Sequence, residues 1–172
     1  MNTFWSSVLD FIGSFRFWIV IGPNEIGVRT FCGKREYQIG PGFHLYFPFV
    51  GEVMHVNVTE QVVDVRSQSI TTKDNVTVAV GISIAYEIVN AIKAIYRVND
   101  FDQSLCNESL RVVEGYVMDH TFDECRDSES MKTFVLVNLR KVATDRWGIK
   151  IHRIGRTEFA KHRVIRLMQD GR

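Results

Sequence analysis

Histidine, cysteine and carboxylate side chains are the residues that could hold a metal ion or exchange protons, and their spacing in this sequence fits neither role. The five histidines are scattered through the chain, and no HExxH pattern occurs. Asp119-His120 followed by Asp123-Glu124 is the densest cluster, which we interpret as a solvated helix end. Since nucleophile-elbow, phosphate-loop and dinucleotide motifs are also lacking, the sequence predicts no metal, no cofactor and no enzymatic activity.

The cysteines favour a reducing environment. Cys32, Cys106 and Cys125 are not at CxxC spacing, and three cysteines cannot all pair with one another. We therefore expect free thiols and a domain on the reducing, cytoplasmic side of a membrane, with the periplasmic side as the alternative.

Charge is balanced overall but uneven along the chain. The net charge of +1 gives no field that would attract nucleic acid, so no nucleic-acid partner is predicted. From Lys150 to Arg172, seven Lys or Arg residues stand against two acids, so this end carries +5 and the rest −4. The basic end has two interpretations: an exposed strand face followed by a helix start, or a patch for anionic lipid or an acidic neighbouring subunit.

The first 16 residues have the composition of a membrane anchor. Asp10 and Arg16 interrupt the apolar residues of this segment and Ser6, Ser7 and Ser14 dilute them, so it falls short of the roughly 20 mainly apolar residues of a spanning helix. We expect an in-plane or re-entrant anchor, and the alternative is a helix packed on the protein itself. The apolar residues recur at helical spacing and continue just past the segment, and those expected to contact lipid are Phe4, Trp5, Val8, Leu9, Phe11, Ile12, Phe15 and Trp18.

A second aromatic stretch follows the turn residues Gly40-Pro41-Gly42. Phe43, Leu45, Phe47 and Phe49 alternate with other residues, as in a strand with one apolar face. One interpretation is a core strand. The other is a loop that touches the bilayer, and for that case Phe47 and Phe49 join the expected lipid contacts.

The most regular element is a strand within residues 67–88. Every second residue from Val76 to Ile88 is large and apolar, which predicts one buried face that contains Val78, Val80, Ile82 and Ile84. The strand is long, so a bend or bulge is expected near Gly81. Lys73 and Asn75 lie in the polar corner before the strand and are expected to tolerate substitution.

The remaining elements complete an α+β fold. Residues 17–21 and 26–31 read as a hairpin around a four-residue loop, and further strands are expected at 53–58, 62–66 and 149–159. Helices are expected at 90–97, 101–120 and 128–146; Asp100 would cap the second, and residues 121–124 have capping-box spacing. We predict four segments: an anchor (1–16), an antiparallel β lobe (17–88), an α/β lobe with helices on one face of a sheet (89–160) and a basic helix start (161–172).

Several of these segments, in this order, resemble the stomatin/prohibitin/flotillin/HflK-HflC (SPFH, band 7) superfamily. They are GPNEIGVRTF, IGPGFHLYFPFVGEV, ITTKDNVTVAVGISIAYEI, the helices that follow and WGIKI, which together cover roughly residues 17–168. The resemblance implies a membrane-bound oligomeric scaffold that is not an enzyme. Most relatives continue into a coiled coil, whereas no heptads follow Met168, so the chain reads as a short member that lacks this region.

Two functions are expected on this basis. The first is a self-assembling scaffold on membrane lipid that forms rings or cages, organises membrane microdomains, or regulates membrane proteins including proteases. The alternative is a soluble interaction module that binds or caps another band 7 assembly or partner protein.

For the first function we expect a homo-oligomer larger than a tetramer. The opposite charges of the two parts of the chain offer a contact between neighbouring subunits. Its basic side would include Arg153, Arg156 or Arg163, and its acidic side would include Asp119, Asp123, Glu124 or Asp127.

Overall fold

The computed structural model describes residues 18–47 and 51–161, which form two compact units. The described chain up to Thr59, together with Ile88–Asn99, belongs to the first unit. Glu60–Glu87 and the described residues from Asp100 onward form the second unit. The sequence placed the boundary after Ile88, whereas in the structure residues 60–87 belong with the helices that cover them.

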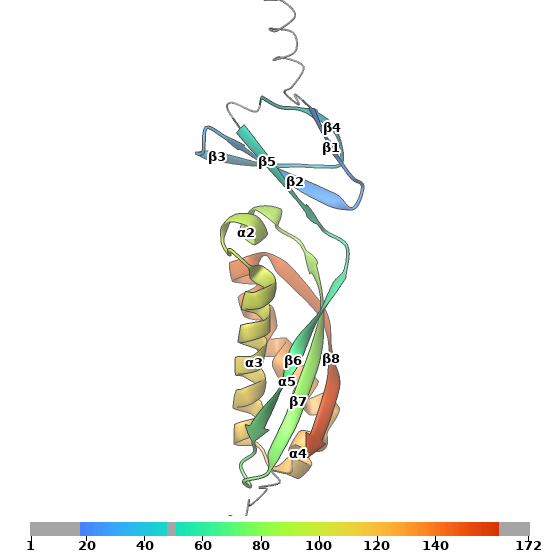
Figure 1. Ribbon diagram of the computed structural model, residues 1–172, viewed down its shortest axis with the longest axis vertical. Helices are drawn as coiled ribbons and strands as arrows, with labels where there is room; N and C mark the ends of the chain where they lie inside the picture. Colours follow the sequence, from blue (N-terminus) through green and yellow to red (C-terminus); the bar gives the residue numbers. More distant parts are fainter. Residues whose placement is uncertain (1–17, 48–50, 162–172) are drawn as a thin grey trace, which may run out of the picture. The chain divides into compact units, whose positions relative to one another are not determined.

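The first unit contains two small sheets (Figure 1). Strands β3 (Arg35–Ile39), β2 (Glu25–Phe31) and β5 (Gly51–Asn57) form one antiparallel sheet in that order. Strands β1 (Trp18–Ile21) and β4 (Gly42–Leu45) pair with each other in the second sheet.

The predicted hairpin between residues 17–21 and 26–31 is therefore wrong in its pairing. The turn itself is present, because the Glu25 N–H donates to the Gly22 carbonyl at 3.1 Å. The chain uses this turn to pass from one sheet to the other. A Cβ on Gly27 would lie 2.8 Å from Ile39 Cγ1 and closer still to the Ile21 side chain, so glycine lets β1 lie over β2.

The central sheet of the first unit is covered on both faces. Helix α2 (Ala91–Tyr96) contacts β2, β3 and β5, and the Tyr96 hydroxyl lies 2.7 Å from Thr30 Oγ1. Thr30 marks the face of β2 that α2 covers, and Gly27 marks the face that β1 covers. Because these two residues are three positions apart on a strand, α2 and the β1–β4 sheet cover opposite faces. The first unit is thus built in three thin layers.

The second unit is a three-stranded sheet with helices on one face (Figure 1). The strand order is β6 (Gln61–Thr71), β7 (Thr77–Ile88) and β8 (Ile149–Lys161). Helix α3 (Phe101–Asp119) packs on β6, α5 (Ser128–Val142) packs on β8, and the two helices contact each other. The short helix α4 (Phe122–Arg126) connects them, and a π-helical turn, η1 (Ala143–Trp147), leads into β8.

The core of the second unit confirms the register predicted for β7. Val78, Val80, Ile82 and Ile84 are at most 1% exposed. Residues Arg66 and Ser67 of β6 oppose the single residue Gly81, between the pairs Val65–Ile82 and Gln68–Val80. This two-against-one arrangement is a β-bulge, so the bulge predicted near Gly81 is confirmed and lies on the partner strand.

The predicted helix caps are also confirmed. Asp100 accepts a hydrogen bond from the Gln103 N–H at the start of α3. Thr121 and Glu124 form the capping box of α4, and Gly148 adopts the left-handed conformation after η1.

The corner before β7 differs from the sequence expectation at one residue. Asn75 has a φ of 60°, in the left-handed region that glycine, asparagine and aspartate adopt more easily than other residues. Substitution of Asn75 is therefore restricted by the backbone. The side chain of Lys73, in contrast, is exposed, although its N–H donates to the His120 carbonyl.

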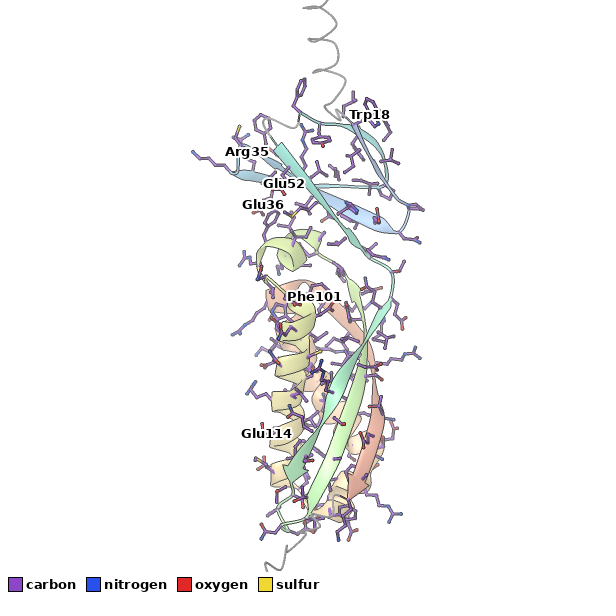
Figure 2. The ribbon with its side chains drawn as sticks, viewed as in Figure 1. Trp18, Arg35, Glu36, Glu52, Phe101 and Glu114 are labelled. Carbon is purple, nitrogen blue, oxygen red and sulfur yellow. The ribbon has the colours of Figure 1, made fainter. Side chains whose placement is uncertain are left out.

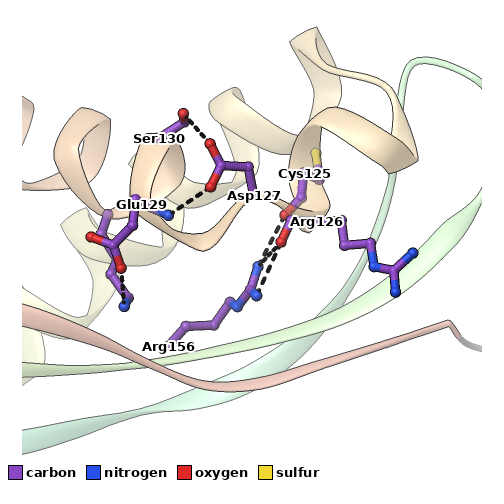
Figure 3. Close-up of polar contacts among 7 residues, drawn as sticks. Cys125, Arg126, Asp127, Glu129, Ser130 and Arg156 are labelled. Atoms are coloured by element: carbon purple, nitrogen blue, oxygen red, sulfur yellow. Dashed lines mark hydrogen bonds and ion pairs between the residues drawn. The ribbon is translucent and has the colours of Figure 1, made fainter.

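Arg156 of β8 holds α4 in place (Figure 3). Its Nη1 donates to the carbonyls of Cys125 and Arg126 at 3.0 and 3.2 Å, and its Nη2 also reaches Arg126 at 3.2 Å. The guanidinium carbon lies 4.8 Å from the ring centroid of Phe159. Arg156 thus satisfies carbonyls that a helix C-terminus leaves without intrahelical partners.

Replacing Val80 with aspartate should unfold much of the second unit. The substitution buries an unpaired carboxylate in the core, with an expected loss of about 3 kcal/mol or more in the free energy of unfolding. Chemical denaturation followed by circular dichroism measures this loss. Val62→Asp is the matched control, because Val62 lies on the same sheet but is 59% exposed. Equal stability of the Val80 variant and wild type would disprove the register.

Replacing Arg156 with glutamine should loosen α4. Loss of the charged donor to two carbonyls is expected to reduce the free energy of unfolding by about 1–2 kcal/mol. The control is Arg126→Gln, whose side chain points away from the cluster (Figure 3) and should change stability by less than about 0.5 kcal/mol. Indistinguishable melting curves for the two variants would show that Arg156 does not stabilise the fold.

Candidate functional site

One face of the β1–β4 sheet is apolar and exposed. Trp18 lies opposite Leu45 and Val20 opposite Phe43, so the four side chains occupy one face. We call these four residues the β1–β4 face. Their exposed fractions are 54% for Trp18, 68% for Val20, 62% for Phe43 and 66% for Leu45.

The other face of the same two strands turns toward the first unit's central sheet. Ile21 is 2% exposed and lies against the position of Gly27. Both sides of β1 are therefore apolar, and the central sheet covers only one of them. No described element covers the β1–β4 face. Contiguous exposed apolar surface of this kind is typical of a site that contacts a membrane or a partner.

The expected lipid contacts can be compared with this face at two positions. Trp18, which Figure 2 labels, belongs to this face because it lies opposite Leu45, and Phe47, two residues beyond Leu45, is 64% exposed. The other expected contacts, Phe4, Trp5, Val8, Leu9, Phe11, Ile12, Phe15 and Phe49, lie outside the described residues.

For its described part, the structure excludes one of the two interpretations of the aromatic stretch, and contact with a bilayer stays a prediction. Phe43, Leu45 and Phe47 are exposed, so the core-strand interpretation is wrong for these residues. Val20, Phe43 and Leu45, which share the exposed face with Trp18, were not among the expected contacts. The sequence does contain a signal for these three residues. Trp18 and Val20, and likewise Phe43 and Leu45, are apolar residues two positions apart, so each pair lies on one side of its short strand. Helices long and apolar enough to cross a bilayer are absent from residues 18–47 and 51–161.

The charged residues expected at a subunit contact fall into two groups. Asp119, Asp123 and Arg153 are exposed; Arg153 lies 3.5 Å from Glu60 in a solvent-exposed pair. Arg156 instead binds the C-terminus of α4. Arg163 lies outside the described residues.

Glu124 and Asp127 also have local partners (Figure 3 shows those of Asp127). Hydrogen bonds from the Thr121 N–H, the larger cause, and from the Thr121 hydroxyl hold the pKa of Glu124 below its usual range. Ser130 and the Glu129 N–H do the same for the pKa of Asp127, which caps α5. A lowered pKa means that the stabilisation is present above the ordinary carboxyl pKa and is lost as pH falls through the lowered value. Both carboxylates therefore serve the helix starts.

Polar residues of the second unit line a cavity and form a partly buried hydrogen bond between a hydroxyl and a carboxylate. A cavity of about 600 Å³ between β6 and α3 is lined by Asp64, Asp100 and Asp102, among other residues. The Tyr86 hydroxyl donates to Asp102 at 2.7 Å. Burial is the main cause that raises the pKa of Tyr86, and the hydrogen bond to Asp102 is the second. Groups of three or more residues with metal-ligand side chains are absent from the described part of the chain. Among the described surfaces, the exposed apolar β1–β4 face has the clearest binding character.

Comparison with known proteins supplies the family. Residues 19–169 match the model of the SPFH domain/Band 7 family. An uncharacterized protein of Methanothermobacter thermautotrophicus is 33% identical over 135 residues, which cover 78% of this chain and 42% of that protein. A stomatin homologue of Pyrococcus horikoshii is 29% identical over 132 residues, which cover 77% of this chain and 50% of the homologue.

A viral protein is also similar. A putative band 7 family protein of Acanthamoeba polyphaga mimivirus is 24% identical over 173 aligned positions, which cover 89% of this chain and 55% of the viral protein. The chain thus spans about half the length of these three relatives. The match over residues 19–169, together with the antiparallel sheets and one-sided helices of the structure, shows that this chain belongs to the SPFH domain/band 7 family.

Proposed function

We propose that this protein is a membrane-associated, self-assembling scaffold of the band 7 type, and that its β1–β4 face contacts lipid. The observation that carries the proposal is the exposure of all four apolar side chains of that face. In water this surface is costly to hydrate, and a bilayer would remove that cost. The segment at residues 1–16, with its aromatic and apolar composition, would add a second contact.

The face alone would bind weakly. Burial of a large apolar side chain is worth about 1.5–3 kcal/mol when complete, and these four are already partly covered by the protein. The total is then about 4–8 kcal/mol, which corresponds to a reversible attachment. Several subunits joined together would bind far more tightly, because each further attachment becomes intramolecular. Membrane contact and assembly therefore reinforce each other.

Assembly into a ring or cage larger than a tetramer requires a contact between two different flanks of the domain. Arg153 on β8 offers the basic side, and the exposed Asp119 and Asp123 offer the acidic side. Such charges set register and salt sensitivity, while apolar contacts supply affinity. Met118 of α3 is 52% exposed and is a candidate for the apolar part.

The role of such an assembly would be to organise membrane microdomains or to enclose and regulate membrane proteins, including proteases. Membership in the SPFH domain/band 7 family supports this role. We place the domain on the reducing, cytoplasmic side. A soluble module that binds or caps another band 7 assembly is the outcome to expect if lipid binding fails the test below.

The membrane contact predicts the behaviour of a double variant, Phe43→Ser with Leu45→Ser. Loss of two apolar side chains from the face should weaken binding to phosphatidylcholine vesicles by about tenfold or more. Co-sedimentation of the full chain with vesicles measures the bound fraction.

The matched control is Val62→Ser with Val137→Ser, which removes two equally exposed apolar side chains from the second unit. Circular dichroism should show that both variants remain folded. If the Phe43/Leu45 variant binds vesicles as well as wild type, the face does not contact lipid and the soluble-module interpretation is favoured.

The assembly contact predicts a smaller particle for Arg153→Glu. The pair with Glu60 is exposed and contributes at most about 1 kcal/mol, so the subunit should remain folded. Charge reversal should reduce particle size in detergent, and more strongly at low ionic strength, where charges are less screened. Light scattering after gel filtration measures size. Lys141→Glu on α5 is the control, and an unchanged size for Arg153→Glu at every salt concentration would remove this residue from the interface.

A further inference from the structure

A shallow cavity of about 400 Å³ lies on the first unit's central sheet, beside the β1–β4 sheet. Its lining residues alternate between basic and aromatic across two strands: Arg29 opposes Tyr37, Phe31 opposes Arg35, and Ile39 completes the lining. The two arginines are diagonal neighbours on one face, at a separation that long side chains can span. Gly27 and Ile39 share this face, so it is the side on which β1 packs.

The cavity concentrates positive charge. No carboxylate lines it, and no ion pair involves Arg29 or Arg35 within the described residues. Glu36 and Glu52 lie opposite Thr30 on the two neighbouring strands, and Figure 2 labels both with Arg35. Because Thr30 is next to Arg29 on β2, both carboxylates lie on the other face of the sheet. Glu25, at the other end of β2, accepts the Gly22 N–H. Two neighbouring guanidiniums without a counter-ion form a site suited to an anion.

The cavity is adjacent to the surface that we propose for lipid. Arg29 Nη1 reaches the carbonyl of Leu45 at 3.4 Å, and the Leu45 side chain belongs to the β1–β4 face. The arginines lie on the central sheet, one layer beneath that face. A lipid with acyl chains over the face would therefore have its headgroup at the level of the arginines.

From these observations we propose that Arg29 and Arg35 bind the phosphate headgroup of an anionic lipid whose acyl chains lie against the β1–β4 face. The planar guanidinium donates two parallel hydrogen bonds to phosphate oxygens, which gives geometric as well as electrostatic selection. Phe31, Tyr37 and Ile39 line the same cavity and provide apolar contact for the glycerol region. This inference rests on the proposed membrane contact and adds a preference for headgroup chemistry.

The test compares neutral phosphatidylcholine vesicles with vesicles that also contain phosphatidylglycerol. The wild-type full chain should bind the anionic vesicles more tightly than the neutral ones. In the double variant Arg29→Gln with Arg35→Gln, the ratio of these two affinities should fall about tenfold, while binding to neutral vesicles stays unchanged. The matched control is Arg126→Gln with Lys141→Gln, which removes the same charge from exposed positions of the second unit and should keep the preference.

The outcomes separate this site from the proposed function. Failure of wild type to bind any vesicle removes the membrane contact itself, whereas equal binding to both vesicle types overturns only the headgroup site. The site is also overturned if the Arg29/Arg35 variant keeps the preference, or if the control loses as much. Titration with inorganic phosphate is the last measurement. If phosphate binds to wild type but not to the Arg29/Arg35 variant, and both proteins show the same preference for anionic vesicles, the arginines bind free anions and the lipid assignment fails.

Discussion

The burial of β7 is the interaction on which the second unit depends. One face of this strand carries Val78, Val80, Ile82 and Ile84 beneath the helices, and none of them is more than 1% exposed. The other face of β7 carries small residues that leave room for side chains of the neighbouring strand β8; a Cβ at Gly81 would lie 2.7 Å from Thr157 Oγ1, and one at Gly155 would lie 2.6 Å from Ser83 Oγ. The helices therefore cover one face of β7, while β6 and β8 lie along its two edges, and the register of β7 determines where α3 and α5 can pack.

β7 also links the two units along the chain. Its last residue, Ile88, belongs to the first unit and is followed closely by α2, which covers one face of the central sheet there. The other face is covered by β1 and β4, which have four residues each. Such a thin layer can bury one of its own faces and leaves the other exposed. The apolar β1–β4 face is therefore a consequence of layer thickness as well as of composition.

Several charged residues around α4 bind backbone groups of their own subunit. Arg156 binds the C-terminus of α4, Glu124 completes a capping box and Asp127 caps α5. Each side chain satisfies backbone groups that a helix end leaves unpaired. A count of charges along the sequence cannot show which charged side chains also bind backbone groups of their own subunit.

The sequence by itself determined the elements that follow local rules. Period-two alternation set the register of β7, Asp100 and the Thr121–Glu124 box marked helix starts, and the ordered segments indicated the family and its α+β fold. Only the tertiary structure decided that β1 pairs with β4, that Phe43 and Leu45 face outward, and that Arg156 binds α4. Alternation and capping act between residues a few positions apart, so a short segment contains the whole signal. Strand partners, layer coverage and the contacts of a long side chain depend on residues far away in sequence, and their choice is made by the packing of the complete domain.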